Sequence, residues 1–192
     1  PLQLIAAAVQ DGVGTPDVLL PPGASPHHYA LRPSDVRKVG QVDLLYWIGP
    51  DMEGFLPRVL GSRSKPTVAV QNLPGLTLRH FGEDSHSHAQ DADEHDHDHR
   101  PGSLDAHLWL SSVNARVIAA KMAADLAQVD PANAARYQSN LKAFDERLIE
   151  ALADADQHHS QVALLWFDLD NFKAVNDSFG HATGDELLLA YS

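Results

Sequence analysis

The chain has 192 residues, of which 44% are hydrophobic and 21% charged, and its 14 basic and 26 acidic side chains give a formal net charge of −12. That length suits one large domain or two small ones with a hydrophobic core. The acidic balance argues against nonspecific binding to nucleic acid or to anionic membranes, both of which require clustered Lys and Arg. The absence of cysteine excludes disulfides, thiolate zinc sites and thiol catalysis, whereas 12 histidines point to metal binding.

Helical and strand-like patterns alternate along the first 70 residues. Apolar residues at helical spacing predict a first helix over residues 2–13, which Gly12 and Gly14 end. Short apolar runs then predict three buried strands, and the segments between them predict two short helices. The strands are expected at residues 17–20, 43–48 and 67–70, and the helices at residues 34–39 and 52–60. This alternation predicts βαβ units, and therefore an α/β fold with a parallel sheet flanked by helices.

The pattern breaks between residues 71 and 105. Within it, residues 80–99 hold six histidines and seven acidic residues, which cannot build a core, so a mobile surface loop is predicted. An Ala-rich pattern then predicts a helix over residues 111–129, and Asp130-Pro131 starts a second helix that ends near residue 155. A further buried strand is expected at residues 162–167 and a short helix at residues 171–179. No apolar run approaches the roughly 20 residues that span a bilayer, so no membrane insertion is expected.

Two histidines outside that loop are candidate zinc ligands. His27 lies in Pro-Pro-Gly-Ala-Ser-Pro-His-His-Tyr-Ala-Leu-Arg-Pro-Ser-Asp, and His107 lies in Asp-Ala-His-Leu-Trp-Leu. Zinc accepts neutral imidazole nitrogen in a tetrahedral site, and ligands of open α/β sheets gather at the carboxyl ends of the strands. Composition by itself leaves two interpretations open, a pair of ligands or two loop histidines that bond to the backbone.

These segments resemble a known family. The two histidine segments, the intervening Asp-Leu-Leu-Tyr-Trp-Ile-Gly-Pro-Asp-Met-Glu and the His/Asp loop are similar, in this order, to the zinc-uptake (ZnuA-type) solute-binding proteins of bacterial ABC transporters. The resemblance covers about residues 1–157 and implies a periplasmic receptor with two α/β lobes joined by one long helix. It implies Zn²⁺ as the ion bound between the lobes, His27 and His107 as the ligands of the first lobe, and a cognate ABC permease as partner. The chain has no recognisable signal peptide.

The sequence departs from the family pattern in three ways. Pro26 stands where some relatives have a Glu before the first histidine, and the family's first strand would precede Pro1. The family's third histidine comes from a second lobe that we do not find in the chain. A two-imidazole site completed by water is expected to bind zinc more weakly than a closed one.

The His/Asp loop is expected to capture several ions weakly and to deliver them or to sense them, because ordering a flexible chain costs conformational entropy. The alternative is a solvated acidic linker that happens to contain histidine. Its candidate ligands are His80, His86, His88, His95, His97 and His99.

Residues 162–189 resemble a second family, the opening of the GGDEF (diguanylate cyclase) domain. The motif runs from a strand that ends in Asp-x-Asp, through Phe-Lys and Asn-Asp, to Gly-His-x-x-Gly-Asp. This resemblance implies that Asp168 binds Mg²⁺ and that five residues contact the nucleotide, namely Asn171, Phe172, Lys173, Asn176 and Asp185. The signature turn of that family would follow beyond Ser192, so cyclase activity is not expected. The preferred interpretation is a strand–helix unit that packs on the first lobe.

The two resemblances imply different cellular compartments, which suggests a chimera joined near residues 157–161. We divide the chain into an N-terminal α/β lobe, a long linking helix and an incomplete GGDEF-like fragment, at residues 1–128, 129–157 and 158–192. If the fragment replaces a strand of the second lobe, Asp168 or Asp170 could also face the zinc as an oxygen ligand. The leading hypothesis is a periplasmic zinc-binding module that is not an enzyme. The alternative is a truncated GTP- and Mg²⁺-binding fragment or a fusion without native activity.

Overall fold

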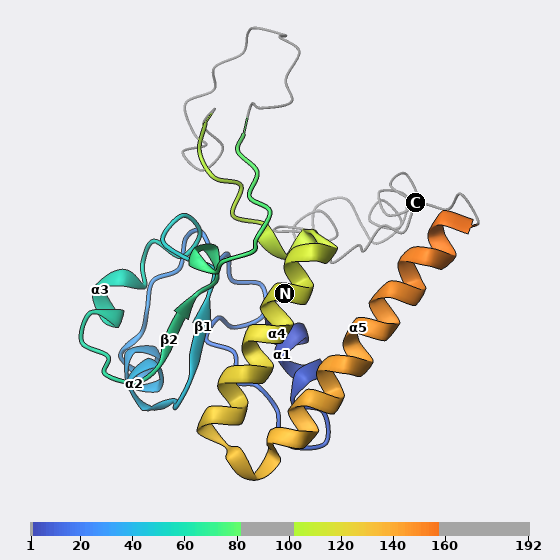
Figure 1. Ribbon diagram of the computed structural model, residues 1–192. Helices are drawn as coiled ribbons and strands as arrows, with labels where there is room; N and C mark the ends of the chain where they lie inside the picture. The colour runs from blue at the N-terminus through green and yellow to red at the C-terminus, as the bar shows by residue number, and fades with distance from the viewer. Residues whose placement is uncertain (1, 82–101, 158–192) are drawn as a thin grey trace, which may run out of the picture.

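A computed structural model of the chain describes residues 2–81 and 102–157. Its centre is a parallel pair of strands, β1 (Leu45–Trp47) and β2 (Thr67–Ala69), with Tyr46 opposite Val68. Figure 1 shows α2 (Pro33–Gln41) and α3 (Pro57–Leu60) on one side of this pair, and α1 (Leu2–Val9), α4 (Ser112–Val129) and α5 (Ala134–Gln157) on the other. The predicted α/β class, with a parallel sheet flanked by helices, is confirmed.

The two long helices follow the strands in the chain and pack against each other. Ser111 caps α4 by accepting a hydrogen bond from the backbone N–H of Asn114, as a serine before an apolar periodic segment predicts. A 3₁₀ turn, Pro131–Asn133, then reverses the chain, and α5 packs back along α4 (Figure 1). Arg116 and Asp145 tie the two helices by a pair of hydrogen bonds of 2.7 and 2.9 Å. The helix predicted at residues 111–129 is confirmed within one residue, whereas the helix predicted from residue 131 begins as the 3₁₀ turn and becomes α-helical only at Ala134, ending two residues beyond the predicted residue 155.

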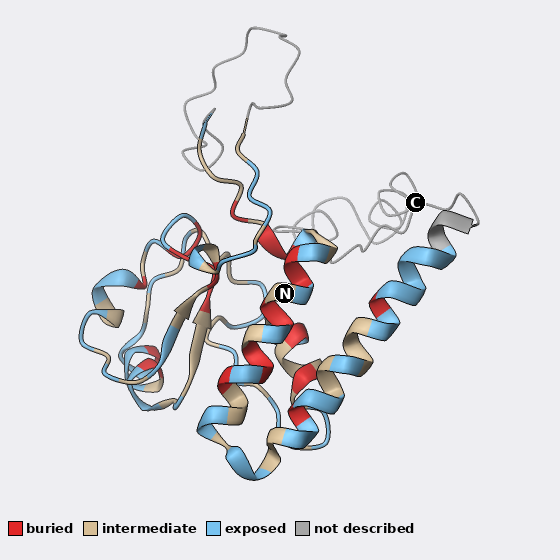
Figure 2. Cartoon of the chain, in the orientation of Figure 1, coloured by how far each residue is buried: buried red, intermediate tan, exposed pale blue. Residues whose placement is uncertain are grey.

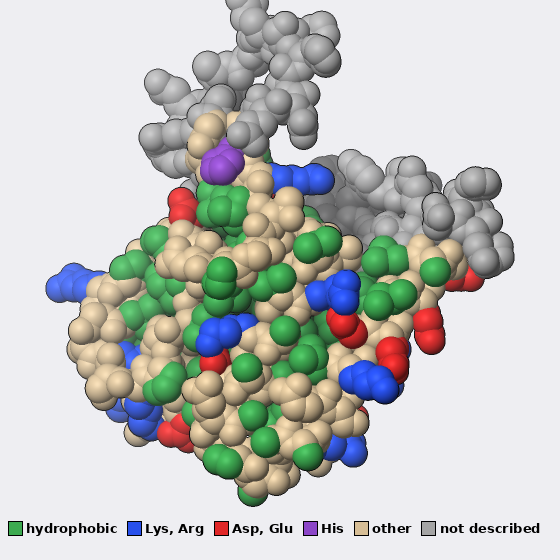
Figure 3. Space-filling view, in the orientation of Figure 1, with side chains coloured by type: hydrophobic (Ala, Val, Ile, Leu, Met, Phe, Trp, Pro, Cys, Tyr) green, Lys and Arg blue, Asp and Glu red, His purple; other side chains and the backbone are tan. Residues whose placement is uncertain are grey.

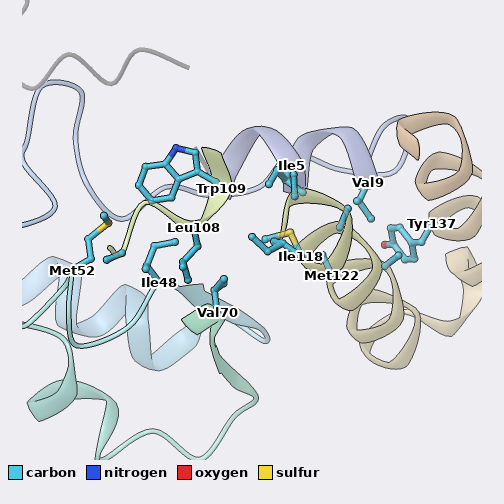
Figure 4. Packing of buried hydrophobic residues seen from close by; sticks show 14 residues of the cluster. Ile5, Val9, Ile48, Met52, Val70, Leu108, Trp109, Ile118, Met122 and Tyr137 are labelled. Carbon is cyan, nitrogen blue, oxygen red and sulfur yellow. The ribbon is translucent and has the colours of Figure 1, made fainter. Parts of the chain in front are cut away.

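One hydrophobic cluster joins the N-terminal helix to α4, α5 and the sheet. Ile118 and Val9 are completely buried, and Figure 4 shows them beside Met122 and Tyr137, with Ile48, Val70 and Leu108 continuing the cluster toward the strands. Buried residues recur along α4 in Figure 2, whereas the C-terminal part of α5 is largely exposed. On the face in Figure 3, Lys and Arg side chains alternate with Asp and Glu. None of the helices within the described ranges has the length and hydropathy needed to cross a bilayer.

Three predicted elements of the first 70 residues differ in the structure. The strand predicted at residues 17–20 is wrong, because residues 17 and 18 have no regular secondary structure, residues 19 and 20 form a bend, and Val18 is 41% exposed. The helix predicted at residues 52–60 begins only at Pro57, which fits the first turn of a helix but not its interior. The first helix ends at Val9 instead of residue 13, and a turn follows in which Gly12 has a φ of +75°.

Several sequence predictions lie outside the described residues. They are the course of the His/Asp loop beyond Phe81, the strand–helix unit at residues 162–179 and the GGDEF-like division at residues 158–192. The described residues do include both ends of the loop. Arg79, His80 and Phe81 pair in antiparallel fashion with residues 102–105.

Candidate metal site

The first candidate ligand, His27, lies in a bend just ahead of α2. The backbone N–H of His27 donates to the Ser25 hydroxyl at 3.3 Å, and the following residues are fixed by the start of the helix. There the Asp35 carboxylate accepts hydrogen bonds from the Tyr29 hydroxyl at 3.0 Å and from the Arg32 backbone N–H at 2.9 Å. Because Tyr29 is two residues after His27, the helix cap holds the histidine loop in place. Asp35, the third residue of α2, thus caps the start of the helix.

The charge of Asp35 is stabilised at this cap. The Arg32 guanidinium donates to both carboxylate oxygens at 3.1 and 3.3 Å, and this hydrogen bonding is the main cause that lowers the pKa of Asp35 to about 2. Only 5% of the surface of Asp35 is exposed. Because its pKa is about 2, the Asp35 carboxylate stays ionised at neutral pH even though it is buried.

The second candidate ligand, His107, immediately precedes the 3₁₀ turn Leu108–Leu110. One oxygen of Asp105 accepts the backbone N–H of His107 at 3.0 Å and lies 2.7 Å from its ring Nδ1. When Nδ1 carries the proton and donates it to this carboxylate, Nε2 is the nitrogen that presents a lone pair to a metal. The ring also meets Trp109 edge-on, with the ring centres 5.4 Å apart.

A buried asparagine fixes the turn after His107. Asn114, which is 1% exposed, donates from its side-chain amide to the carbonyls of Leu108 and Thr77 at 3.0 and 2.9 Å. Its side-chain oxygen accepts from the Thr77 N–H at 2.7 Å. This residue therefore ties the turn after His107 and the segment before the His/Asp loop to the first turn of α4.

The structure brings the two predicted ligands together. The ring centres of His27 and His107 are 6.0 Å apart with an interplanar angle of 51°. Two imidazoles that share one tetrahedral zinc through bonds of about 2.0–2.1 Å have ring centres about 5–6 Å apart, so the observed spacing suits a shared ion. A third imidazole, that of His28, is exposed and lies 6.4 Å from His27 between ring centres. Within the described ranges, no three His, Asp or Glu side chains converge closely enough to hold an ion.

Of the remaining predicted site residues, the structure describes His80 alone. His80 lies at the base of the His/Asp loop, opposite Leu104 in the antiparallel bridge. His86, His88, His95, His97 and His99 lie outside the described residues, and so do Asp168, Asn171, Phe172, Lys173, Asn176 and Asp185.

Sequence reasoning missed two carboxylates. Asp105 was overlooked, although a carboxylate two residues before a candidate metal-binding histidine is a usable signal. Glu53, which is 9% exposed, accepts the backbone N–H groups of Ile48 and Gly49 at 3.0 and 3.1 Å, at the carboxyl end of β1. Burial outweighs these hydrogen bonds and raises the pKa of Glu53 to about 7. No periodicity in the sequence marked this residue as buried.

Comparisons with known proteins agree on one family. The family model "ZnuA: Zinc-uptake complex component A periplasmic" matches residues 1–180, which includes most of the segment that resembles the GGDEF opening. The high-affinity zinc uptake system protein ZnuA of Yersinia pestis is 38% identical over 161 residues, covering 78% of this chain and 51% of that protein. The protein of the same description from Brucella abortus is 37% identical over 176 residues, covering 77% and 52%. The chain thus spans about half the length of these curated relatives.

Solved structures share the fold. The metal-dependent lipoprotein YcdH from Bacillus subtilis superposes with a TM-score of 0.60 at 22% identity, covering 78% of this chain and 49% of that one. Zn(II)-bound AdcA from Streptococcus pneumoniae gives a TM-score of 0.59 at 20% identity, covering 78% and 29%.

Proposed function

The chain belongs to the ZnuA family, and from this premise we propose that it is a zinc-binding lobe of a periplasmic solute receptor, not an enzyme. Relatives at 37–38% identity are named for high-affinity zinc uptake. The observation that carries the proposal is the 6.0 Å separation of the His27 and His107 rings, which come from segments 80 residues apart.

The proposed site binds Zn²⁺ as cargo through two neutral imidazoles. His107 coordinates through Nε2, because its Nδ1 faces the Asp105 carboxylate at 2.7 Å. Water or a further protein ligand fills the other two positions of the tetrahedron.

The wider organisation belongs to the same proposal. The lobe is residues 1–128 and the linking helix residues 129–157, most of which is α5. The six histidines of residues 80–99 capture ions weakly and deliver them to the lobe site or sense them. The receptor works in the periplasm and passes its zinc to a cognate ABC permease.

A zinc titration of the full chain tests the site. We expect His27→Ala and His107→Ala each to weaken the tightest site by at least about tenfold, since each removes one metal bond. His28→Ala is the matched control and should leave that site within about twofold. A tight stoichiometric site that survives in the double variant His27→Ala/His107→Ala with residues 82–101 excised would contradict the proposal.

A nucleotide-binding role for residues 162–189 remains a separate prediction from sequence resemblance. GTP binding with Mg²⁺ that Asn176→Ala or Asp185→Ala abolishes would favour it, and absence of binding would retire it. The zinc role of Asp168 likewise stays a prediction, which unchanged zinc affinity in Asp168→Ala would refute.

A further inference from the structure

The base of the His/Asp loop is a short antiparallel neck formed by residues 79–81 and 102–105. The Phe81 N–H donates to the Ser103 carbonyl at 2.9 Å, and the Gly102 N–H donates to the Phe81 carbonyl at 2.6 Å. On the other side of the His80–Leu104 bridge, the Asp105 N–H donates to the Arg79 carbonyl at 2.8 Å. The neck therefore ends on Asp105.

Asp105 connects the neck to a candidate metal ligand. Its backbone belongs to the neck, and its carboxylate contacts both the backbone N–H and the ring Nδ1 of His107 at 3.0 and 2.7 Å. A carboxylate in this position selects the tautomer and the orientation of the ring. The neck therefore pairs the backbone of the same residue whose carboxylate contacts His107.

We propose that the neck is a positioning device for His107, in which the pairing of residues 79–81 with residues 102–105 sets Asp105, and Asp105 sets the ring that binds the metal. In consequence, the backbone pairing at the base of the His/Asp loop is linked to the lobe site through Asp105. This link requires no histidine side chain of the loop. This inference rests on the proposed zinc function for its purpose, but the coupling can be measured without metal.

The segments before the neck and after His107 are both held by Asn114 of α4. Asn114 of α4 holds Thr77, two residues before Arg79, through two hydrogen bonds of 2.7 and 2.9 Å. The same side chain holds the Leu108 carbonyl just after His107. The segments entering the neck and leaving His107 are thus both hydrogen-bonded to one buried side chain, with the neck and Asp105 between them.

The test uses the full chain with two kinds of variant. Phe81→Pro removes the N–H that pairs with Ser103 without touching Asp105, and Phe81→Ala is the matched control that keeps the N–H. Asp105→Ala removes the carboxylate, and Asp105→Asn keeps a neutral acceptor for the Nδ1–H.

The first measurement is the tautomer of His107, read from its ring ¹⁵N chemical shifts in metal-free protein at pH 8. We expect the parent, Phe81→Ala and Asp105→Asn to hold the Nδ1–H form. Asp105→Ala should shift the ring toward the Nε2–H form, and Phe81→Pro should shift it part of the way. An unchanged tautomer in Phe81→Pro and Asp105→Ala overturns the proposal.

The second measurement is zinc affinity at the tightest site, by competition with a chelator. We expect a loss of about 10–100-fold for Asp105→Ala, as for other groups that orient metal ligands. Phe81→Pro should lose about 3–10-fold, the size of one hydrogen bond. In the Asp105→Ala background, Phe81→Pro should change affinity by less than about twofold, because the two act through the same group.

If Phe81→Pro lowers zinc affinity by the same factor in the parent and in Asp105→Ala, its effect is a general structural one. That result would overturn the proposed coupling. A parent chain that binds no zinc at His27 and His107 would overturn the proposed function instead, while the tautomer measurement would still decide the role of the neck.

Discussion

At the scale of single residues, two buried carboxylates respond to their surroundings in opposite ways. Asp35 faces the Arg32 guanidinium, which lowers its pKa to about 2, whereas desolvation raises the pKa of Glu53 to about 7. Glu53 accepts only neutral backbone N–H groups, whose hydrogen bonds do not offset the loss of water. The two residues therefore give the lobe two separate pH responses.

Glu53 should make the folded lobe less stable as the pH rises toward neutrality. The folded pKa lies above the value of 4.5 expected when the chain unfolds, so the folded state binds the extra proton between about pH 4.5 and 7. The contribution of Glu53 to the free energy of unfolding is therefore largest below pH 4.5. It falls by about 3 kcal/mol between pH 4.5 and pH 7 and is constant above pH 7.

Glu53→Gln keeps an oxygen acceptor for Ile48 and Gly49 without the charge. Urea unfolding at several pH values should show the decline in the parent relative to this variant, whose difference from the parent should widen between pH 5 and 7. Parallel pH profiles for the two proteins would contradict this prediction.

At the scale of elements, the start of α2 and the histidine loop before it form one unit. The Asp35 carboxylate links the helix to Tyr29 and Arg32, and Tyr29 also packs edge-on against Phe55 with ring centres 5.7 Å apart. The low pKa of Asp35 means that this link is complete above pH 3.8 and is lost only as the pH falls through about 2.

Removal of this carboxylate should loosen the loop without unfolding the helix. Asp35→Ala takes away the acceptor of the Arg32 N–H, so we expect exchange of that amide to accelerate by about tenfold, as for one lost hydrogen bond. Tyr29→Phe is the control, because it removes only the hydroxyl donor and leaves the Arg32 N–H bonded. Hydrogen exchange followed by NMR measures both. Equal protection of Arg32 in the parent and in Asp35→Ala would be the contrary result.

At the scale of the whole molecule, α4 joins the parts of the lobe. Its Ile118 and Met122 pack in the cluster shared with α1, the strands and Tyr137 of α5 (Figure 4). On the sheet side, the Tyr46 hydroxyl of β1 donates to Asp125 of α4 at 2.5 Å, and Lys121 donates to the same carboxylate. Contacts of this kind predict that the sheet and the helices unfold together.

A cavity at the centre of this cluster should destabilise every part at once. Ile118 is completely buried, so Ile118→Ala should cost about 2–5 kcal/mol and Ile118→Val about 0.5–1.5 kcal/mol. Urea unfolding followed by far-ultraviolet circular dichroism and by tryptophan fluorescence should give the same midpoint for each variant. Two separate midpoints would mean that α4 and α5 unfold independently of the sheet, contrary to the prediction.

Several elements were predictable because their signals are local in the sequence. Ser111 and the Ala-rich pattern after it predicted α4, Asp130-Pro131 predicted the turn into the next helix, and alternating apolar runs predicted the parallel pair of strands. The family resemblance that names the histidine segments is also a property of the sequence. These features were predictable because capping, helical periodicity and strand length depend on neighbours along the chain.

Features that depend on contacts between distant segments could not be predicted from local sequence patterns. The apolar run at residues 17–20 forms no strand, although its composition predicts one, since a strand forms only where a second segment lies alongside to pair with it. The approach of His27 to His107, the burial of Glu53 and the neck that ends on Asp105 are likewise contacts between segments or consequences of packing. A residue's type and its immediate neighbours do not specify which other segment will lie against it, and such contacts set the distance between His27 and His107 and the burial that raises the pKa of Glu53.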